Sequence, residues 1–205
     1  MKTVAQSVPE PEGHVLQVPE SVFLSDTQFF DLCQVNRDLR IERTAAREIV
    51  IMSPTGWETG SRNAEIIAQL RTWARADGTG VSVDSSTGFK LPNGAIREPD
   101  AAWVRKTRLS SVPPDQKQRF LPLAPDFAIE LRSPSDQLAV LQSKMVEYVE
   151  NGVQLGWLLD PEIRSVYVYR PHAQVEELKN VSSVAADPEA PGFTLDLKLV
   201  WEPEI

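Results

Sequence analysis

Apolar residues recur with helical periodicity between about residues 58 and 76. Ile66, Leu70 and Trp73 fall on one face of this stretch, because an α-helix completes a turn every 3.6 residues. Asn63 lies on the same face one turn earlier. A polar side chain on a buried face needs a hydrogen-bond partner, which a neighbouring carboxylate, a metal-bound water, a helix cap or a core contact could each supply.

Shorter apolar runs elsewhere are rich in β-branched and aromatic residues and end at turn-forming residues, as strands do. They predict strands at about residues 39–42, 48–52, 81–83, 89–91, 100–104, 127–131, 157–160, 166–169 and 193–197. Further helices are expected at about residues 26–33 and 136–151, each preceded by Ser or Asp residues that can cap a helix. This mixture of elements predicts an α/β fold.

The predicted elements form one domain over residues 21–205, since a chain of 205 residues can bury a single core and shows no shift in composition. Residues 1–20 contain several prolines and few large apolar residues, so we expect a flexible lead-in. The segment 105–122 is rich in proline and charge and is expected to be a loop.

The rarity of cysteine and histidine limits the metal chemistry that the chain can support. Cys33 is the single cysteine, which excludes an internal disulfide and a thiolate zinc site. With His14 and His172 as the only histidines, a multi-histidine cage is excluded as well. A bound metal would therefore have carboxylate ligands, which favours Mg²⁺ or Mn²⁺.

The charge and hydropathy patterns bear on partners and location. A formal net charge of −8 is unusual for a protein that binds nucleic acid, although a locally basic stretch between residues 105 and 119 shows that charge is unevenly distributed. That stretch equally fits an ordinary solvated loop. No apolar run is long enough for a membrane helix and no secretion signal is evident, so we expect a cytoplasmic protein without membrane contact.

Glu130 is the most informative residue because it interrupts the apolar run Phe127–Leu131. A buried carboxylate is costly unless it is paired or bound to metal. Strand alternation places Glu130 and Arg132 on one face, so a buried ion pair between them is one explanation. The alternative is a metal site shared with Asp100, which opens the preceding strand. Asp100 alone would fit a simple strand-entry turn.

A phosphodiester nuclease also needs a positive group beside the charge that develops in the transition state. Lys144 lies at the edge of the apolar stripe of its predicted helix, from where its stem could reach towards Glu130, or simply extend along an apolar rim. Arg132 is the competing candidate. It can stabilise charge but stays protonated, so it is a poor general base.

The segments REPDAAWV, PDFAIELRSPSD, KMVEYVENGVQLGWLLDPE and VYVYRP resemble the Uma-type restriction endonuclease family, within the PD-(D/E)XK nuclease superfamily. The upstream segments IVIMSPTG, NAEIIAQL and DSSTGFKLPNG are similar to the same family. The resemblance covers about residues 20–200, and its specificity comes from the order and spacing of motifs that are individually short.

This resemblance implies a restriction-endonuclease-like central mixed β-sheet flanked by helices. It places the metal ligands at Asp100 and Glu130, and Asn63 at a helix position often occupied by His or Asn. Arg132 stands where the superfamily pattern has lysine, and in this family that lysine maps onto Lys144. By analogy with the superfamily, a homodimer is expected.

We therefore predict Mg²⁺- or Mn²⁺-dependent hydrolysis of DNA phosphodiester bonds. Asp100, Glu130 and a backbone carbonyl near Leu131 would bind the metal, and Lys144 would position or activate the water. Arg132 would stabilise the phosphate and Asn63 would support the site. Two alternatives stay open: a catalytically inactive nucleic-acid-binding module, suggested by Arg132, and a protein-interaction module, suggested by the net charge.

Overall fold

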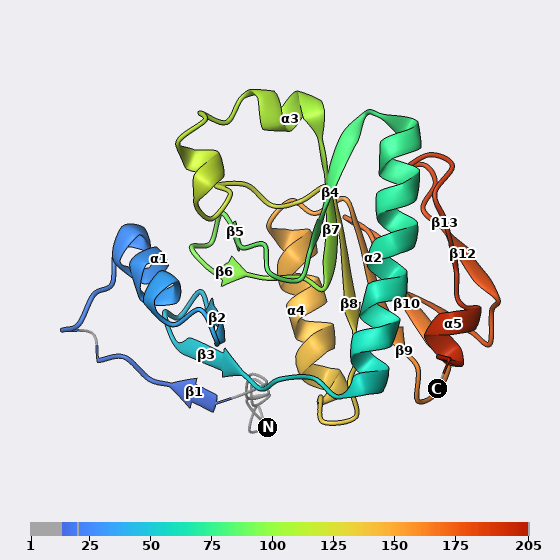
Figure 1. Cartoon of the computed structure of the whole chain (residues 1–205), viewed down its shortest axis with the longest axis horizontal. Helices are drawn as coiled ribbons and strands as arrows, with labels where there is room; N and C mark the ends of the chain where they lie inside the picture. Colours follow the sequence, from blue (N-terminus) through green and yellow to red (C-terminus); the bar gives the residue numbers. More distant parts are fainter. Residues whose placement is uncertain (1–13, 20, 205) are drawn as a thin grey trace, which may run out of the picture.

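A six-stranded mixed sheet forms the centre of the computed structural model, which describes residues 14–19 and 21–204 (Figure 1). Its strand order is β11-β10-β9-β8-β7-β4. β8 and β9 run parallel, and the other neighbouring pairs are antiparallel. The strands are β4 (Gly80–Asp84), β7 (Ala101–Arg105), β8 (Phe127–Leu131), β9 (Leu155–Asp160), β10 (Ser165–Tyr169) and β11 (Glu176–Lys179).

The two longest helices cover opposite faces of this sheet: α2 (Trp57–Asp77) lies on one face and α4 (Leu138–Glu150) on the other (Figure 1). Phe127 and Ile129 of β8 belong to the core beneath α2, whereas Ala128 belongs to the core beneath α4. This alternation follows from the two-residue repeat of a strand. It also places Glu130 on the α4 face, inside the protein.

A second sheet, with the order β1-β3-β2-β6-β5, packs beside the first and contributes charged residues to the site described below. α1 (Asp26–Val35) lies against it through Phe29, which is fully buried with Ile41 and Ile49. Ser25 and Gln28 form a capping box at the start of α1, as the expected cap requires. The strands are β1 (His14–Leu16), β2 (Arg40–Arg43), β3 (Ile49–Met52), β5 (Phe89–Lys90) and β6 (Ile96–Arg97).

Three sequence-based expectations need correction. The segment 105–122 is not simply a loop, since it contains α3 (Lys106–Ser110) and the 3₁₀ helix η1 (Gln116–Gln118). Within the expected lead-in, β1 pairs with β3, whereas residues 1–13 and 20 lie outside the described residues. α4 begins at Leu138 because Asp136 accepts a hydrogen bond from the Ser133 backbone instead of capping the helix.

The C-terminal part packs along α2 with a hairpin of β12 (Ser183–Ala185) and β13 (Thr194–Asp196), followed by α5 (Lys198–Trp201). The mixed α/β architecture predicted from the sequence is confirmed. Among the described residues, no helix is both long enough and apolar enough to cross a lipid bilayer.

A pair of glycine substitutions tests the packing between α2 and the sheet. A Cβ at Gly80 would overlap the buried indole ring of Trp103, so Gly80→Ala should lower the free energy of unfolding by about 1–3 kcal/mol. Gly60 lies inside α2, and the nearest atom to an added Cβ is 4.0 Å away, so Gly60→Ala should raise it by about 0.5–1 kcal/mol. Urea unfolding measures both, and equal effects would contradict this packing.

Candidate active site

The pairing of β7 with β8 brings the two predicted carboxylates together. Ala101 lies opposite Ile129 in this antiparallel ladder, so continuing the register by one residue places Asp100 opposite Glu130. Directly opposite residues project their side chains to the same face. Both residues are buried, with 8% and 4% of their surface exposed, and both line a cavity of about 800 Å³.

Asp100 is held at the end of its strand by groups from three different elements. Its Oδ2 accepts a hydrogen bond from the backbone N–H of Leu131 at 2.9 Å. Its Oδ1 lies 3.4 Å from the side-chain nitrogen of Asn63 on α2 and 3.7 Å from a guanidinium nitrogen of Arg40 on β2. The structure thus uses Asn63 to contact a neighbouring carboxylate, one of the options left open above.

Glu130 is bound by two side chains from α4. The Lys144 ammonium lies 2.9 Å from its Oε1, and the Tyr148 hydroxyl donates to the same oxygen at 2.8 Å. Lys144 and Tyr148 are one helical turn apart, so both reach the strand from the same side. The proximity of Lys144 to Glu130 matches the expectation from its position on the helix, and Tyr148 is a further partner of Glu130.

Glu42 of β2 is a buried site residue that sequence analysis missed. One of its carboxylate oxygens lies 2.9 Å from the Lys144 ammonium and accepts from the backbone N–H of Glu98 at 2.8 Å. The other oxygen accepts from Arg97 at 3.0 Å, and Arg97 also pairs with Glu147 of α4 at 2.7 Å. The second sheet therefore holds α4 in place and fixes Lys144 between two carboxylates.

A signal for the missed residues was present in the sequence. Arg40 and Glu42 alternate with Ile41 along a strand that was correctly expected there, so they share one face of it. Glu42 is buried, as Glu130 is. The same cost of burying a charge applies to both glutamates. The sequence pattern could not show that this strand lies beside α4.

Burial sets the protonation behaviour of the site. It raises the pKa of Glu130 to about 7, because desolvation and the nearby Asp100 outweigh the attraction of Lys144. Desolvation likewise raises the pKa of Asp100. Burial alone would lower the pKa of Lys144, but Glu130 and Glu42 raise it above its usual value. Lys144 is therefore held as a cation at neutral pH.

The structure does not bring Arg132 into this arrangement, contrary to the expectation that it faces a phosphate. Its backbone N–H donates a hydrogen bond to the backbone carbonyl of Leu159 on β9. Its guanidinium lies 2.8 Å from the Asp160 carboxylate and 3.0 Å from the Glu162 carboxylate. Since β8 ends at Leu131, strand alternation no longer directs Arg132 beside Glu130. The suggested Glu130–Arg132 ion pair is therefore wrong. Arg40 and Arg62 line the cavity, and Arg40 is the one that lies beside Asp100.

The donor atoms present fit a hard divalent cation. No group of three or more His, Cys, Asp or Glu side chains is arranged for ion binding in the described part of the chain, so two carboxylates would act with neutral oxygens and water. Mg²⁺ is commonly held in this way. The side-chain oxygen of Asn63 is buried without a hydrogen-bond partner among the described residues, beside Asp100.

The charge balance of the site also fits a cation. Its ion pairs involve five carboxylates and three basic groups, which leaves a formal charge of −2 when all are ionised. Because burial raises the pKa of Glu98 and of Glu130 to about 7, this full charge is reached only above neutral pH in the absence of a bound cation. One divalent ion would neutralise this excess. The carboxylates are Glu42, Glu98, Asp100, Glu130 and Glu147, and the basic groups are Arg40, Arg97 and Lys144.

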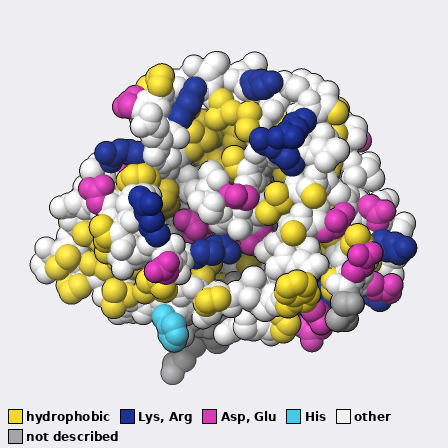
Figure 2. Space-filling view, in the orientation of Figure 1, with side chains coloured by type: hydrophobic (Ala, Val, Ile, Leu, Met, Phe, Trp, Pro, Cys, Tyr) yellow, Lys and Arg dark blue, Asp and Glu magenta, His cyan; other side chains and the backbone are white. Residues whose placement is uncertain are grey.

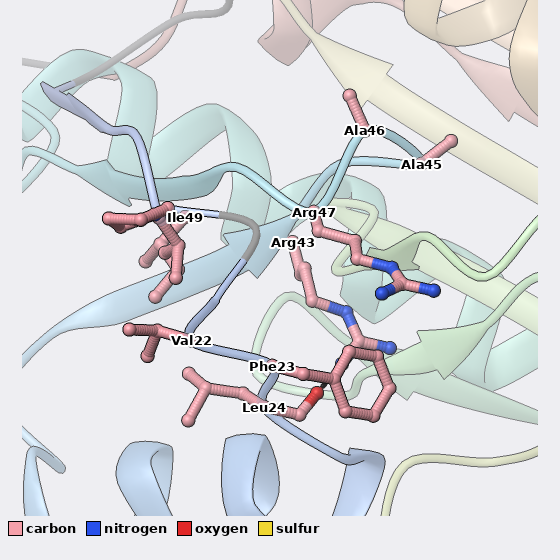
Figure 3. A pocket seen from close by; sticks show the side chains of 10 residues that line it. Val22, Phe23, Leu24, Arg43, Ala45, Ala46, Arg47 and Ile49 are labelled. Atoms are coloured by element: carbon pink, nitrogen blue, oxygen red, sulfur yellow. Dashed lines mark hydrogen bonds between the residues drawn. The ribbon is translucent and has the colours of Figure 1, made fainter.

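A second cavity, of about 420 Å³, lies beside β2 and the segment that precedes α1 (Figure 3). Its lining includes Phe23, Arg43 and Arg47, and none of the described residues that line it is a carboxylate. Arg43 binds Asp26 and two backbone carbonyls, so its guanidinium ties α1 to the second sheet. The described lining of this cavity offers no carboxylate ligand, so the cavity around Asp100 and Glu130 is the candidate site.

Basic and acidic side chains are intermixed on the face drawn in Figure 2, rather than forming one continuous basic surface. Arg105 and Arg108, from the locally basic stretch, both pair with the buried Asp126. Two of the five basic residues that the sequence places in this stretch thus share one carboxylate within the protein.

Substitution of Glu42 tests the ion network through its pH dependence. Burial disfavours the charge of Glu42, but Lys144 and Arg97 outweigh it and lower its pKa from 4.5 to about 2. Such a carboxyl stabilises the fold above its unfolded pKa, and that stabilisation is lost as the pH falls towards the folded pKa. At neutral pH, Glu42→Gln should lower the free energy of unfolding by roughly 3 kcal/mol.

The difference between Glu42→Gln and wild type should shrink as the pH falls from about 4.5 towards 2, in urea unfolding with EDTA present. Glu176→Gln, at an exposed position on β11, serves as the control and should change stability little at any pH. A difference at Glu42 that stays constant with pH would show that its charge is not what matters.

Comparison with solved structures finds the same fold in a protein from Anabaena variabilis, described as "a putative nuclease belonging to DUF820". The TM-score is 0.66 at 20% sequence identity, and the match covers 78% of this chain and 89% of that one. Because the identity is low, the likeness concerns the fold alone, and it confirms the restriction-endonuclease-like α/β architecture. Comparison with curated proteins gives no match.

The family model of Uma2, described as "Putative restriction endonuclease", matches residues 26–198. That range is well over half of the chain and contains every residue of the cavity site. It confirms the resemblance identified from the motifs around Asp100, Glu130 and Lys144. The chain belongs to the Uma2 family of nuclease-like proteins.

Proposed function

We propose that this protein is a nuclease that hydrolyses DNA phosphodiester bonds with a divalent metal ion, Mg²⁺ or Mn²⁺. The observation that carries the proposal is the convergence of Asp100 and Glu130 on one cavity, with Lys144 bound to Glu130. The family description supports nuclease chemistry, and the cavity supplies its acidic and basic groups together.

Asp100 and Glu130 would hold the ion, with the side-chain oxygen of Asn63 and the backbone carbonyl of Leu131 as neutral donors. A bound divalent ion polarises a phosphate and lowers the pKa of a coordinated water. Asn63 and the Leu131 N–H keep the Asp100 carboxylate oriented before substrate arrives. Such preorganisation removes the cost of arranging the ligands during the reaction.

Lys144 and Arg40 supply positive charge in this proposal. Because its pKa is raised, Lys144 serves as a hydrogen-bond donor and a fixed charge rather than as a proton acceptor. Arg40 lines the cavity beside Asp100, and its Nε is buried without a hydrogen-bond partner among the described residues. It takes the role first assigned to Arg132, that of binding a phosphate oxygen.

A homodimer and a cytoplasmic location stay predictions from the sequence. The two alternative functions are separable by experiment, since an inactive nucleic-acid-binding module would retain DNA without cleavage. A protein-interaction module would show no salt-sensitive DNA affinity at low ionic strength.

Removal of either carboxylate should abolish cleavage. In assays of purified protein with DNA and Mg²⁺ or Mn²⁺, Asp100→Asn and Glu130→Gln should each reduce the rate by at least about 100-fold, because each removes a charged ligand. Calorimetric titration with Mn²⁺ gives a second readout, and both variants should bind the ion more weakly than wild type.

Asp38→Asn provides a matched control at an exposed position outside the cavity and should leave cleavage and Mn²⁺ binding unchanged. Thermal unfolding of every variant establishes that it is folded. Cleavage that persists at the wild-type rate in Asp100→Asn or Glu130→Gln would refute the proposed site.

The two arginines should separate activity from stability. Arg40→Ala should reduce the cleavage rate by roughly 10- to 100-fold, because the variant lacks a positively charged group that would bind the phosphate. Arg132→Ala should leave the turnover of folded protein near wild type but lower the unfolding free energy by about 2–4 kcal/mol, since the fully buried Asp160 loses its partner. Turnover rates and urea unfolding of both variants test these expectations. A large loss of turnover in Arg132→Ala, with little loss in Arg40→Ala, would place Arg132 in the active site.

A further inference from the structure

Trp57 is an exposed aromatic residue on the lining of the active-site cavity. It is the first residue of α2 and has 80% of its surface exposed, although it lines the same cavity as Asp100 and Glu130. Trp103 and Trp157 are buried, and Trp73 and Trp201 are half-buried in the core. Within the described residues, Trp57 makes no aromatic pair and no cation–π contact.

The chain geometry keeps Trp57 beside the site. β3 ends at Met52, and a short connection through Pro54 and Gly56 leads directly into α2. In Figure 1 the beginnings of α2 and α4 lie at the same end of the central sheet, and residues from both line the cavity. The cavity that holds Asp100 therefore has the Trp57 side chain on its lining.

We propose that Trp57 is a stacking platform for an unpaired nucleobase, so that the substrate of this site is single-stranded or locally unpaired nucleic acid. This inference rests on the proposed nuclease function and adds the class of substrate. Every base has a flat face that can stack on an indole, so the contact favours no particular sequence.

The size of the cavity supports an unpaired substrate. A volume of about 800 Å³ is in the range of pockets that enclose one small ligand, which suits one or two nucleotides but not a double helix. The two carboxylates that line this cavity, Asp100 and Glu130, are almost fully buried. A strand free of its partner can enter further than a duplex and place a phosphate near them.

The acidic surface supports the same conclusion. Binding to a long duplex depends on many phosphate contacts from Lys and Arg, which a chain with net charge −8 and internally paired arginines is poorly suited to provide. Stacking does not require phosphate neutralisation. A few basic groups in the cavity, together with Trp57, can therefore hold a short unpaired segment on an acidic protein.

Binding measured in EDTA tests this without cleavage. The probes are a fluorescein-labelled single strand of about 12 nucleotides, the same strand in a duplex, and an abasic sugar–phosphate strand of equal length. Trp57→Leu should weaken single-strand binding by about tenfold, whereas Trp57→Phe should keep most of the affinity. Neither substitution should change the weaker binding of the duplex or of the abasic strand.

Two further measurements sharpen the test. The ratio of affinities between wild type and Trp57→Leu should be independent of salt, because stacking releases no counterions. Val35→Ala is the matched control, since Val35 is also 80% exposed but lies at the end of α1, outside the cavity lining. It should bind all three probes as wild type does, and thermal unfolding should confirm that each variant is folded.

Equal single-strand affinity in wild type and Trp57→Leu would overturn the inference, as would an equal loss on the abasic strand. A change from dimer to monomer in Trp57→Leu, with binding intact, would instead assign Trp57 to a protein interface and also overturn it. These experiments distinguish failure of the stacking inference from failure of the proposed nuclease function. If binding depends on Trp57 but no metal-dependent cleavage is found, the proposed reaction is wrong and the stacking role stands. If cleavage depends on Asp100 but is unchanged in Trp57→Leu, the reaction stands and the stacking role is wrong.

Discussion

The antiparallel register between β7 and β8 is the constraint on which the site depends. It sets Asp100 opposite Glu130 and brings the Leu131 N–H to the Asp100 carboxylate. A slip of one residue would turn one of the two carboxylates to the other face of the sheet. β8 is protected from such a slip because it is central, is buried along its whole length and pairs with β9 on its other edge.

The buried charges around Glu130 have an energetic cost that the rest of the structure offsets. Taking ions out of water is unfavourable, and their mutual attraction compensates only when geometry and hydrogen bonding are good. Here Lys144 is shared between two carboxylates, and Arg97 links Glu42 to α4. The second sheet therefore supplies ion-pair partners for charged groups of α4 that the central sheet alone would not pair.

Under the proposed function, the same arrangement would let an acidic protein accommodate a phosphodiester. Its positive groups are few, but Lys144 and Arg40 both line the cavity in which the proposal places the reacting phosphate. Electrostatic stabilisation in a water-poor cavity needs only a small number of well-placed charges. The net charge of the whole chain is then less informative than the charges that face the cavity.

Much of the framework followed from local patterns. Periodicities of 3.6 and two residues depend only on nearby sequence. They predicted the long helix that contains Asn63, the buried strand that contains Glu130 and the helix that carries Lys144. The side of the strand that Glu130 faces could be predicted for the same reason. The position of Asn63 on the buried face of its helix could be predicted in the same way.

The partners of these residues were decided only by tertiary structure. Glu42 and Arg40 reach the site because a strand of another sheet packs beside α4, and no local periodicity specifies which sheets become neighbours. Arg132 turns to Asp160 because β9 lies parallel to β8, a pairing between segments distant in sequence. Sequence alone determined which face of α2 and of β8 is buried, because that depends on local periodicity. The sheet order decided that Glu42 is buried beside α4 and which charges meet.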